Sequence, residues 1–491
     1  MGVLAETGGD NSIPDGATID RVPETWCEIR AGPEYLLRKY VFRNSTFHAH
    51  QYFYEDPDCS RPKYAVSAYG SYQLLRESWY VPGGTEAQYQ VIKAHVIPYT
   101  QEMAAMLNSH FKTGCVDLSF EDLKPFRKQL FMSIPPDDSN EEDDDDDAKK
   151  ELPFVDDIDC SMMLNFSLSE LQLVRTEIRR HYKHHHVSQY NQPKKNKHIK
   201  VVKELLLGNV HTSRRQRQRH RPSAYQTPLK MAETEGCGVC SRVANSNDYY
   251  PPELRTHHGS IMTLQGEWVS TRCESRQRGM FLTRWLSFLS DEKSWQGRYD
   301  YYQDPLCTES SFTLFAKGSY AGGKASSLIP NAKDYSFKVT RLKITPKDIR
   351  VTDHLNYYSG GECGKAKTWK LGVEQDVTFT NGCVTLGIQL PNIEQEVLKM
   401  EVVHRKLHLY VGERFTDEPV RRFRDKRPTS FQEPLVKCDS VSMGMHINSV
   451  YGGQALPLRA GEFRSSSLAA SVSSAWVVLL VCVCFELFLV R

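Results

Sequence analysis

The chain contains 491 residues, of which 40% are hydrophobic, and its 62 Lys and Arg nearly balance its 60 Asp and Glu. This length is typical of two to four domains, each long enough to bury a core. The balanced charge argues against a strongly basic domain, so no nucleic-acid partner is expected, and the apolar content excludes a largely disordered chain. Before the C-terminus no apolar stretch approaches about 18 residues, which excludes a multi-span membrane protein.

The N-terminus lacks the apolar segment of a signal peptide. The rest of the sequence nevertheless favours a secreted protein, because eleven widely spaced cysteines precede the C-terminal tail. Two N-glycosylation sequons, at Asn44 and Asn165, point the same way. We therefore expect residues 1–23 to be an incomplete or mis-joined N-terminus that has lost a signal peptide and one cysteine.

An internal repeat organises the chain between residues 24 and 438. CEIRAGPEYLLRKYVF, which begins at Cys27, aligns without a gap with CESRQRGMFLTRWLSF, which begins at Cys273. QYFYEDPDC similarly matches RYDYYQDPLC, YAVSAYGSY matches FTLFAKGSY, LLLGNVHT matches LYVGERFT, and RPSAYQTPL matches RPTSFQEPL. The order of these matches predicts two copies of one domain. We place the first copy at 24–237, with an acidic insertion at about 120–159 and a basic loop at 181–221, and the second at 238–438.

Equivalent cysteines in the two copies predict equivalent disulfides, although sequence alone does not fix the connectivity. Cys27 and Cys59 correspond to Cys273 and Cys307, and Cys115 and Cys160 correspond to Cys363 and Cys383. Cys240 and Cys438 flank the second copy and could join its two ends. Cys237 would then be unpaired, because its partner should lie upstream of Trp26, where the sequence has no cysteine.

Apolar residues alternate with polar ones over 162–168 and again over 384–390. A period of two predicts half-buried strands, and Asp-Pro turns bound further aromatic strands. A helix after Ser167 is an alternative in this region. The expected fold is mainly β, with two tandem homologous β-barrel-like domains, or sandwiches, stabilised by disulfides.

Several clusters could bind ligands, but each has a simpler interpretation. The acidic run 141–147 and the histidines at 181–186 are better explained as solvated segments than as metal sites. The arginines of 214–221 could contact heparin-like polyanions or form a processing site, although an exposed loop is simpler. Cys237 and Cys240 form a CxxC motif that would suit an extracellular thiol enzyme.

The sequence has no nucleophile elbow, HExxH motif or phosphate-binding loop. No nucleophile lies beside a base in both copies. A duplicated domain without duplicated polar chemistry favours binding over turnover, so we predict a non-enzymatic protein without a cofactor or metal.

The C-terminus is strongly apolar. A polar linker, residues 439–467, precedes the stretch from Ala475 to Val490, which only Glu486 interrupts. We predict a membrane anchor over 468–491, either a single-pass type I helix or a GPI signal. A buried C-terminal helix or strand is the alternative.

The repeated motifs, together with GGTEAQY (83–89), GEWVSTRCE (266–274) and DVTFTNGCVTLGIQLP (376–391), resemble the adenomatosis polyposis coli down-regulated 1 family, which is built from APCDDC domains. The resemblance covers residues 23–438. It implies a plasma-membrane glycoprotein that inhibits Wnt signalling by contacting Wnt proteins and their LDL-receptor-related co-receptor. It also implies barrel domains with a cavity for the Wnt acyl chain. A surface adhesion or receptor ectodomain with filled barrels is the alternative.

Overall fold

The computed structural model describes ten segments of the chain: 2–5, 27–115, 122–134, 158–182, 199–255, 263–358, 360–389, 393–403, 406–416 and 427–438. All of them belong to the unit Met1–Met443. The acidic run 141–147, the histidines at 184–186, the linker and the predicted anchor at 468–491 lie outside the described residues.

The first repeat forms an eleven-stranded sheet that curls into a ring. Around the ring lie β5 (Pro62–Glu77), β4 (Thr46–Tyr54), β3 (Glu34–Arg43), β1 (Gly2–Ala5), β11 (Leu229–Met231), β10 (Ile199–Leu207), β9 (Leu173–Tyr182) and β6 (Thr85–Pro98). β2 (Glu28–Arg30) pairs with β3, and β7 (Gln129–Ser133) and β8 (Ile158–Asp159) extend the sheet from β6. The ring is weakly closed, because β6 and β9 share only two residue pairs.

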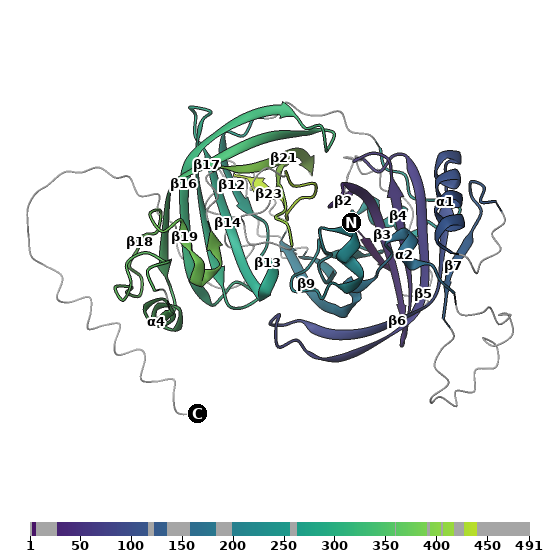
Figure 1. Cartoon of the computed structure of the whole chain (residues 1–491), viewed down its shortest axis with the longest axis horizontal. Coiled ribbons are helices and arrows are strands. Elements are labelled where there is room, and N and C mark those ends of the chain that lie inside the picture. The colour runs from purple at the N-terminus through teal and green to yellow at the C-terminus, as the bar shows by residue number, and fades with distance from the viewer. Residues whose placement is uncertain are drawn as a thin grey trace, which may run out of the picture. The chain divides into compact units, whose positions relative to one another are not determined.

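The second repeat forms a closed eight-stranded barrel, drawn in green in Figure 1. Its strands, in ring order, are β12 (Gly266–Ser270), β23 (Leu435–Lys437), β22 (Lys406–Val411), β21 (Glu394–Val403), β17 (Ala332–Pro346), β16 (Ser310–Ala325), β15 (Ser294–Tyr302) and β14 (Met280–Phe288). β13 (Glu274–Arg276) pairs with β14 and β18 (Gln375–Asp376) pairs with β17, and β19 (Gly382–Cys383) and β20 (Ile388–Gln389) form a separate ribbon. The predicted mainly β, tandem-barrel fold is thus confirmed, with a more open first barrel.

The two barrels differ in the strand that completes the ring. β12 runs antiparallel to both β14 and β23. At the equivalent place in the first repeat, β1 runs parallel to both β3 and β11. The same position in the ring therefore accepts an extended segment of either direction.

The alternation at 162–168 does not mark a strand, so that part of the prediction is wrong, and of 384–390 only Ile388–Gln389 form a strand, the short β20. Residues Ser161–Leu164 form the short helix α2, which ends at Asn165 in the left-handed conformation. A 3₁₀ turn, η1 (Ser169–Gln172), follows, and Val384–Leu386 form the turn η4. The predicted helical face after Ser167 continues instead as β9.

The longer helices follow β6 and β17, at equivalent places in the two repeats. α1 (Gln101–Gly114) begins at Thr100, whose side chain accepts a hydrogen bond from the Met103 N–H at 3.1 Å. α4 (Ile349–Tyr358) contributes Leu355 to the second core. α1 contributes Met103, Leu107 and Phe111 to the first core.

The second core surrounds Trp268, which is fully buried on β12. Its indole N–H donates to the Leu264 carbonyl at 2.8 Å, and the Lys437 ammonium lies 5.6 Å from its ring centre. On the outside of the first barrel, α3 (Gly238–Ala244) covers a further apolar cluster with Val239 and Val243.

Candidate binding sites

The second barrel buries a cluster of charged side chains beneath its apolar core. Glu274 on β13 accepts from the Arg276 guanidinium at 2.5 Å and from Arg284 Nε at 2.9 Å. Arg276 also donates to Gln432 Oε1 at 2.7 Å, and Gln432 Nε2 donates to the Gly412 carbonyl at 2.6 Å. Burial raises the pKa of Glu274, but Arg284 and Arg276 outweigh it and lower that pKa below its usual value.

The first barrel repeats the cluster residue for residue. Glu28 accepts from Arg30 Nε at 2.9 Å and from Arg38 Nε at 2.7 Å. Arg30 donates to Gln226 Oε1 at 2.9 Å, and Gln226 Nε2 donates to the Gly208 carbonyl at 2.6 Å. Burial opposes ionisation of Glu28, yet Arg38 and Arg30 lower its pKa to about 2. The equal geometry explains why the opening motif and the tail motif recur together in both copies.

This duplicated polar cluster was missed by the sequence analysis, which found no duplicated polar chemistry. The signal was present, since both copies carry Glu-x-Arg with a second Arg ten residues after the Glu. The carboxylates of Glu28 and Glu274 are each held by two guanidinium groups, and Glu274 and Arg284 are almost fully buried. Such a cluster fixes the opening strand against the tail of the repeat; it does not present reactive groups to a substrate.

A small hollow lies inside the first barrel. Arg30, Gln51 and Arg217 line it together with apolar side chains such as Phe53, and its volume is about 30 Å³. This space is roughly that of one water molecule. An acyl chain of roughly sixteen carbons needs many times that volume, so in this conformation the hollow does not accommodate one.

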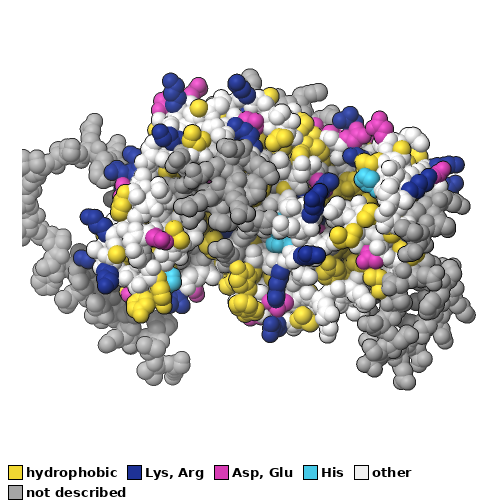
Figure 2. Space-filling model, in the orientation of Figure 1, with side chains coloured by type: hydrophobic (Ala, Val, Ile, Leu, Met, Phe, Trp, Pro, Cys, Tyr) yellow, Lys and Arg dark blue, Asp and Glu magenta, His cyan; other side chains and the backbone are white. Residues whose placement is uncertain are grey.

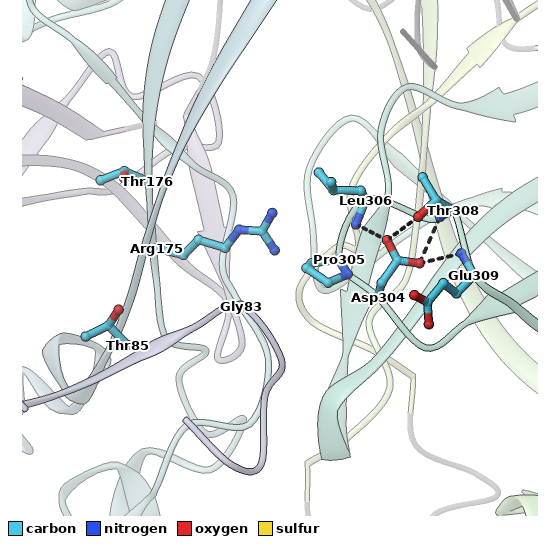
Figure 3. A pocket seen from close by; sticks show the side chains of 9 residues that line it. All are labelled: Gly83, Thr85, Arg175, Thr176, Asp304, Pro305, Leu306, Thr308 and Glu309. Atoms are coloured by element: carbon cyan, nitrogen blue, oxygen red, sulfur yellow. Dashed lines mark hydrogen bonds between the residues drawn. The ribbon is translucent and has the colours of Figure 1, made fainter. Parts of the chain in front are cut away.

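A larger and more open hollow, of about 470 Å³, is shown in Figure 3. One wall carries Arg175 on β9, and the opposite wall is the Asp-Pro turn of the second repeat, with Leu306 and Glu309. Asp304 is occupied within that turn, where it accepts hydrogen bonds from the Leu306, Thr308 and Glu309 N–H groups. Arg175 already pairs with Glu177 at 3.2 Å. The hollow is therefore polar and suits water or a small charged group.

The two repeats contact each other reciprocally. The Thr212 N–H donates to Thr416 Oγ1 at 3.0 Å, and the Thr416 N–H donates to Thr212 Oγ1 at 3.1 Å. These threonines end the matching motifs LLLGNVHT and LYVGERFT, so the contact has the pairing of a two-fold interface. Buried Arg272 adds ion pairs to Glu177 and Glu204, both at 2.9 Å.

Five disulfides occur among the described residues: Cys27–Cys59, Cys115–Cys160, Cys237–Cys240, Cys273–Cys307 and Cys363–Cys383. The expected link between Cys240 and Cys438 is not formed, and Cys237 is not left unpaired, because Cys237 and Cys240 bond to each other at the start of α3. Cys237 caps α3 and Cys240 lies in its first turn, so one helical turn brings the two sulfurs together. Several disulfides are typical of extracellular or secretory proteins.

The two sequon asparagines lie in different surroundings. Asn44 is exposed in the tight turn between β3 and β4. Asn165 is half-buried and lies beside the hollow of the first barrel. Glycosylation of either remains a prediction, and Asn44 is the more accessible acceptor.

Exposed apolar side chains are scattered among charged ones (Figure 2). The most exposed aromatic side chains are Tyr357 on α4 at 81%, and Trp79 and Tyr250 at 74% each. These three side chains belong to separate segments of the chain. No described helix is long and apolar enough to cross a membrane. Within the same residues, no group of three or more His, Cys, Asp and Glu could hold a metal ion.

A histidine cluster lies on the outer face of the first barrel, under the segment that leads to the second repeat. His48 Nε2 lies 2.9 Å from Ser67 Oγ, and the rings of His48 and His50 are 4.2 Å apart. His50 Nε2 lies 3.1 Å from Asp248 Oδ1, and Lys128 Nζ lies 2.7 Å from Asp248 Oδ2. The cluster thus links β4 and β5 to residue 248 of the connecting segment.

Burial lowers the pKa of His48 to about 4, and neighbouring His50, Lys128 and Lys39 add to this effect against the attraction of Asp248. Burial similarly lowers the pKa of His95 on β6 to about 4, with Lys128 and Lys93 adding to it and Asp248 opposing it. Both histidines are therefore neutral at pH 7.

We expect the free energy of unfolding to decrease as the pH falls from about 6.5 to about 4. An unfolded histidine binds its proton near pH 6.5, whereas folded His48 and His95 resist protonation until about pH 4, so acid favours the unfolded state. The variant His48→Gln/His95→Gln should lose about 1–3 kcal/mol of this pH dependence. Urea titrations at several pH values test it, and an unchanged slope in the variant would contradict it.

The comparison with known families agrees with this architecture. The family model described as adenomatosis polyposis coli down-regulated 1, the APCDDC domain, matches the chain twice, at residues 19–255 and 256–451. Each match covers one barrel and its duplicated polar cluster, except that β1 (Gly2–Ala5) lies before the first match. The chain therefore belongs to the APCDDC family, with two tandem copies of its domain.

Proposed function

We propose that this protein is a plasma-membrane glycoprotein that negatively regulates Wnt signalling by binding Wnt proteins, their LDL-receptor-related co-receptor, or both. The observation that carries the proposal is the pair of APCDDC domains, which together span most of the chain. The disulfides support an extracellular location for both repeats. The apolar stretch from Ala475 to Val490 supplies the proposed anchor, as a type I helix or a GPI signal.

We further propose that the protein acts by binding and without catalysis. The buried carboxylates Glu28 and Glu274 are each engaged by two arginines, which suits a scaffold role. Contacts with Wnt through protein surfaces are favoured over capture of its acyl chain inside the first barrel. The hollow there is small and is lined by Arg30 and Arg217, and burying methylenes beside guanidinium groups gains little.

A surface adhesion or receptor ectodomain is the second candidate function. The charged cluster and the hollow of about 30 Å³ favour a filled first barrel, which this function would also need. It predicts no affinity for Wnt.

Binding of the anchored full chain to acylated Wnt, and to Wnt whose acylated serine is replaced, separates these functions. We expect comparable affinity for both ligands, because the proposed contacts are between protein surfaces. An affinity lost on replacement would assign the interaction to the acyl chain and contradict the filled-barrel mode. Binding to neither Wnt nor the co-receptor would contradict the proposed function and favour the adhesion ectodomain.

A further inference from the structure

The arginine-rich segment forms an ordered turn whose two sides differ. Residues Arg214–Arg219 form the 3₁₀ turn η2, in which side chains three positions apart lie on the same side. Arg214 and Arg217 therefore face the same carboxylate, Glu34, and each pairs with one of its oxygens. The intervening residues are directed to other sides of the turn.

Arg217 fixes this turn to the barrel. Its side chain is 7% exposed and donates to Glu34 Oε2 at 2.5 Å, to the Ala31 carbonyl at 2.8 Å and to the His211 carbonyl at 3.2 Å. Gln218 Nε2 donates to the Phe166 carbonyl at 3.1 Å. The sequence allowed a processing site at Arg214-x-x-Arg217. The buried Arg217 does not suit it, because a protease must reach both of these arginines.

The remaining arginines face solvent. Arg215 and Arg219 are exposed, and the side chains of Arg214 and Arg221 are 52% and 72% exposed although they pair with Glu34 and Glu86. Five arginines between positions 214 and 221 thus share the two carboxylates that pair with them among the described residues. The turn therefore carries an excess of positive charge, and Arg217 holds its backbone against the barrel.

We propose that this arginine turn, residues 214–221, binds a sulfated polysaccharide. Guanidinium groups match the geometry of sulfate oxygens with two parallel hydrogen bonds, and a pinned backbone loses little conformational entropy when its exposed arginines bind. A repeating polyanion can contact several arginines at once, which a single small anion cannot do. The disulfides of this repeat are typical of extracellular proteins, which meet such polysaccharides.

Binding of the purified full chain to immobilised heparin, as a function of salt, tests the proposal. We expect Arg215→Gln/Arg219→Gln to weaken heparin binding roughly tenfold at about 0.15 M salt. The salt dependence of binding should also become flatter, because two contacts between an arginine and a sulfate group are lost. Arg221→Gln should show a smaller loss of the same kind. The matched control, Arg298→Gln/Arg341→Gln, removes two partly exposed arginines of the second repeat and should bind like the unmodified chain.

Three results would overturn the proposal. The first is an equal loss in the control, which would mean that net charge alone governs binding. The second is equal binding of single-stranded DNA or of unsulfated hyaluronate, which would remove the preference for sulfate. The third is unchanged heparin binding in both the double variant and Arg221→Gln. Thermal unfolding should be unaffected in every variant, since Arg217 and Glu34 are left in place.

Discussion

Replacing Glu274 with glutamine should destabilise the second barrel by about 3–5 kcal/mol. The substitution keeps the size of the side chain but leaves Arg276 and Arg284 without the carboxylate that compensates their charge. Glu274 is 1% exposed and Arg284 is 4% exposed, so water cannot replace the lost partner. Urea denaturation of Glu274→Gln, followed by tryptophan fluorescence, measures the loss.

The control for this experiment is Glu374→Gln. Glu374 pairs with Lys343 at the surface of the same barrel, where its side chain is 45% exposed. Exposed pairs contribute at most about 1 kcal/mol, so this variant should unfold almost like the parent chain. Equal stability of the two variants would mean that the buried cluster does not hold the opening strand.

Replacing Gly318 with alanine should also cost several kcal/mol of stability, because the added methyl group meets the backbone of the next strand. A Cβ at this position would lie 1.8 Å from the Lys338 carbonyl oxygen. Gly318 sits where the register between β16 and β17 shifts, and this bulge brings the two backbones together. Gly70 occupies the same place in the first repeat, where an added Cβ would lie 2.1 Å from the Gln90 carbonyl oxygen.

Gly238→Ala is the matched control, since a Cβ there would meet no atom within 4 Å. Gly238 begins α3, where alanine is favoured over glycine by up to about 1 kcal/mol. The free energy of unfolding of Gly318→Ala should therefore fall by about 2–4 kcal/mol, while that of Gly238→Ala should stay the same or rise. A stable Gly318→Ala barrel would show that β16 and β17 can separate at the bulge.

The contacts of the histidine cluster and of the arginine turn could not be predicted from local sequence patterns. The sequence placed Arg214–Arg221 in a basic loop, and nothing local indicated that Arg217 pairs with Glu34, 183 residues away. His48 and Asp248 likewise lie on segments far apart in the chain, and only the folded barrel brings them together. Electrostatic surroundings depend on such long-range contacts, so local composition does not predict them.

The CxxC motif is a further place where the structure differs from the prediction made from the sequence. The sequence suggested a disulfide between Cys240 and Cys438, because these cysteines flank the second copy and could join its two ends. In the structure α3 instead brings Cys237 within bonding distance of Cys240. The alternation at 162–168 likewise predicted a strand, but Ser161–Leu164 form α2 and the turn η1 begins after this stretch, at Ser169. In both places the local backbone conformation, which tertiary packing selects, decided the outcome.

The sequence by itself determined the class and the organisation of this protein. Two runs of matching motifs required two copies of one domain, and aromatic and β-branched residues between Asp-Pro turns required strands, because these properties depend on residues close together in the chain. Only the tertiary structure decided which barrel is fully closed, which charges are buried and which arginines face solvent. Those outcomes arise from contacts such as Arg30 with Glu170, 140 residues apart, and from exclusion of water as the barrel closes.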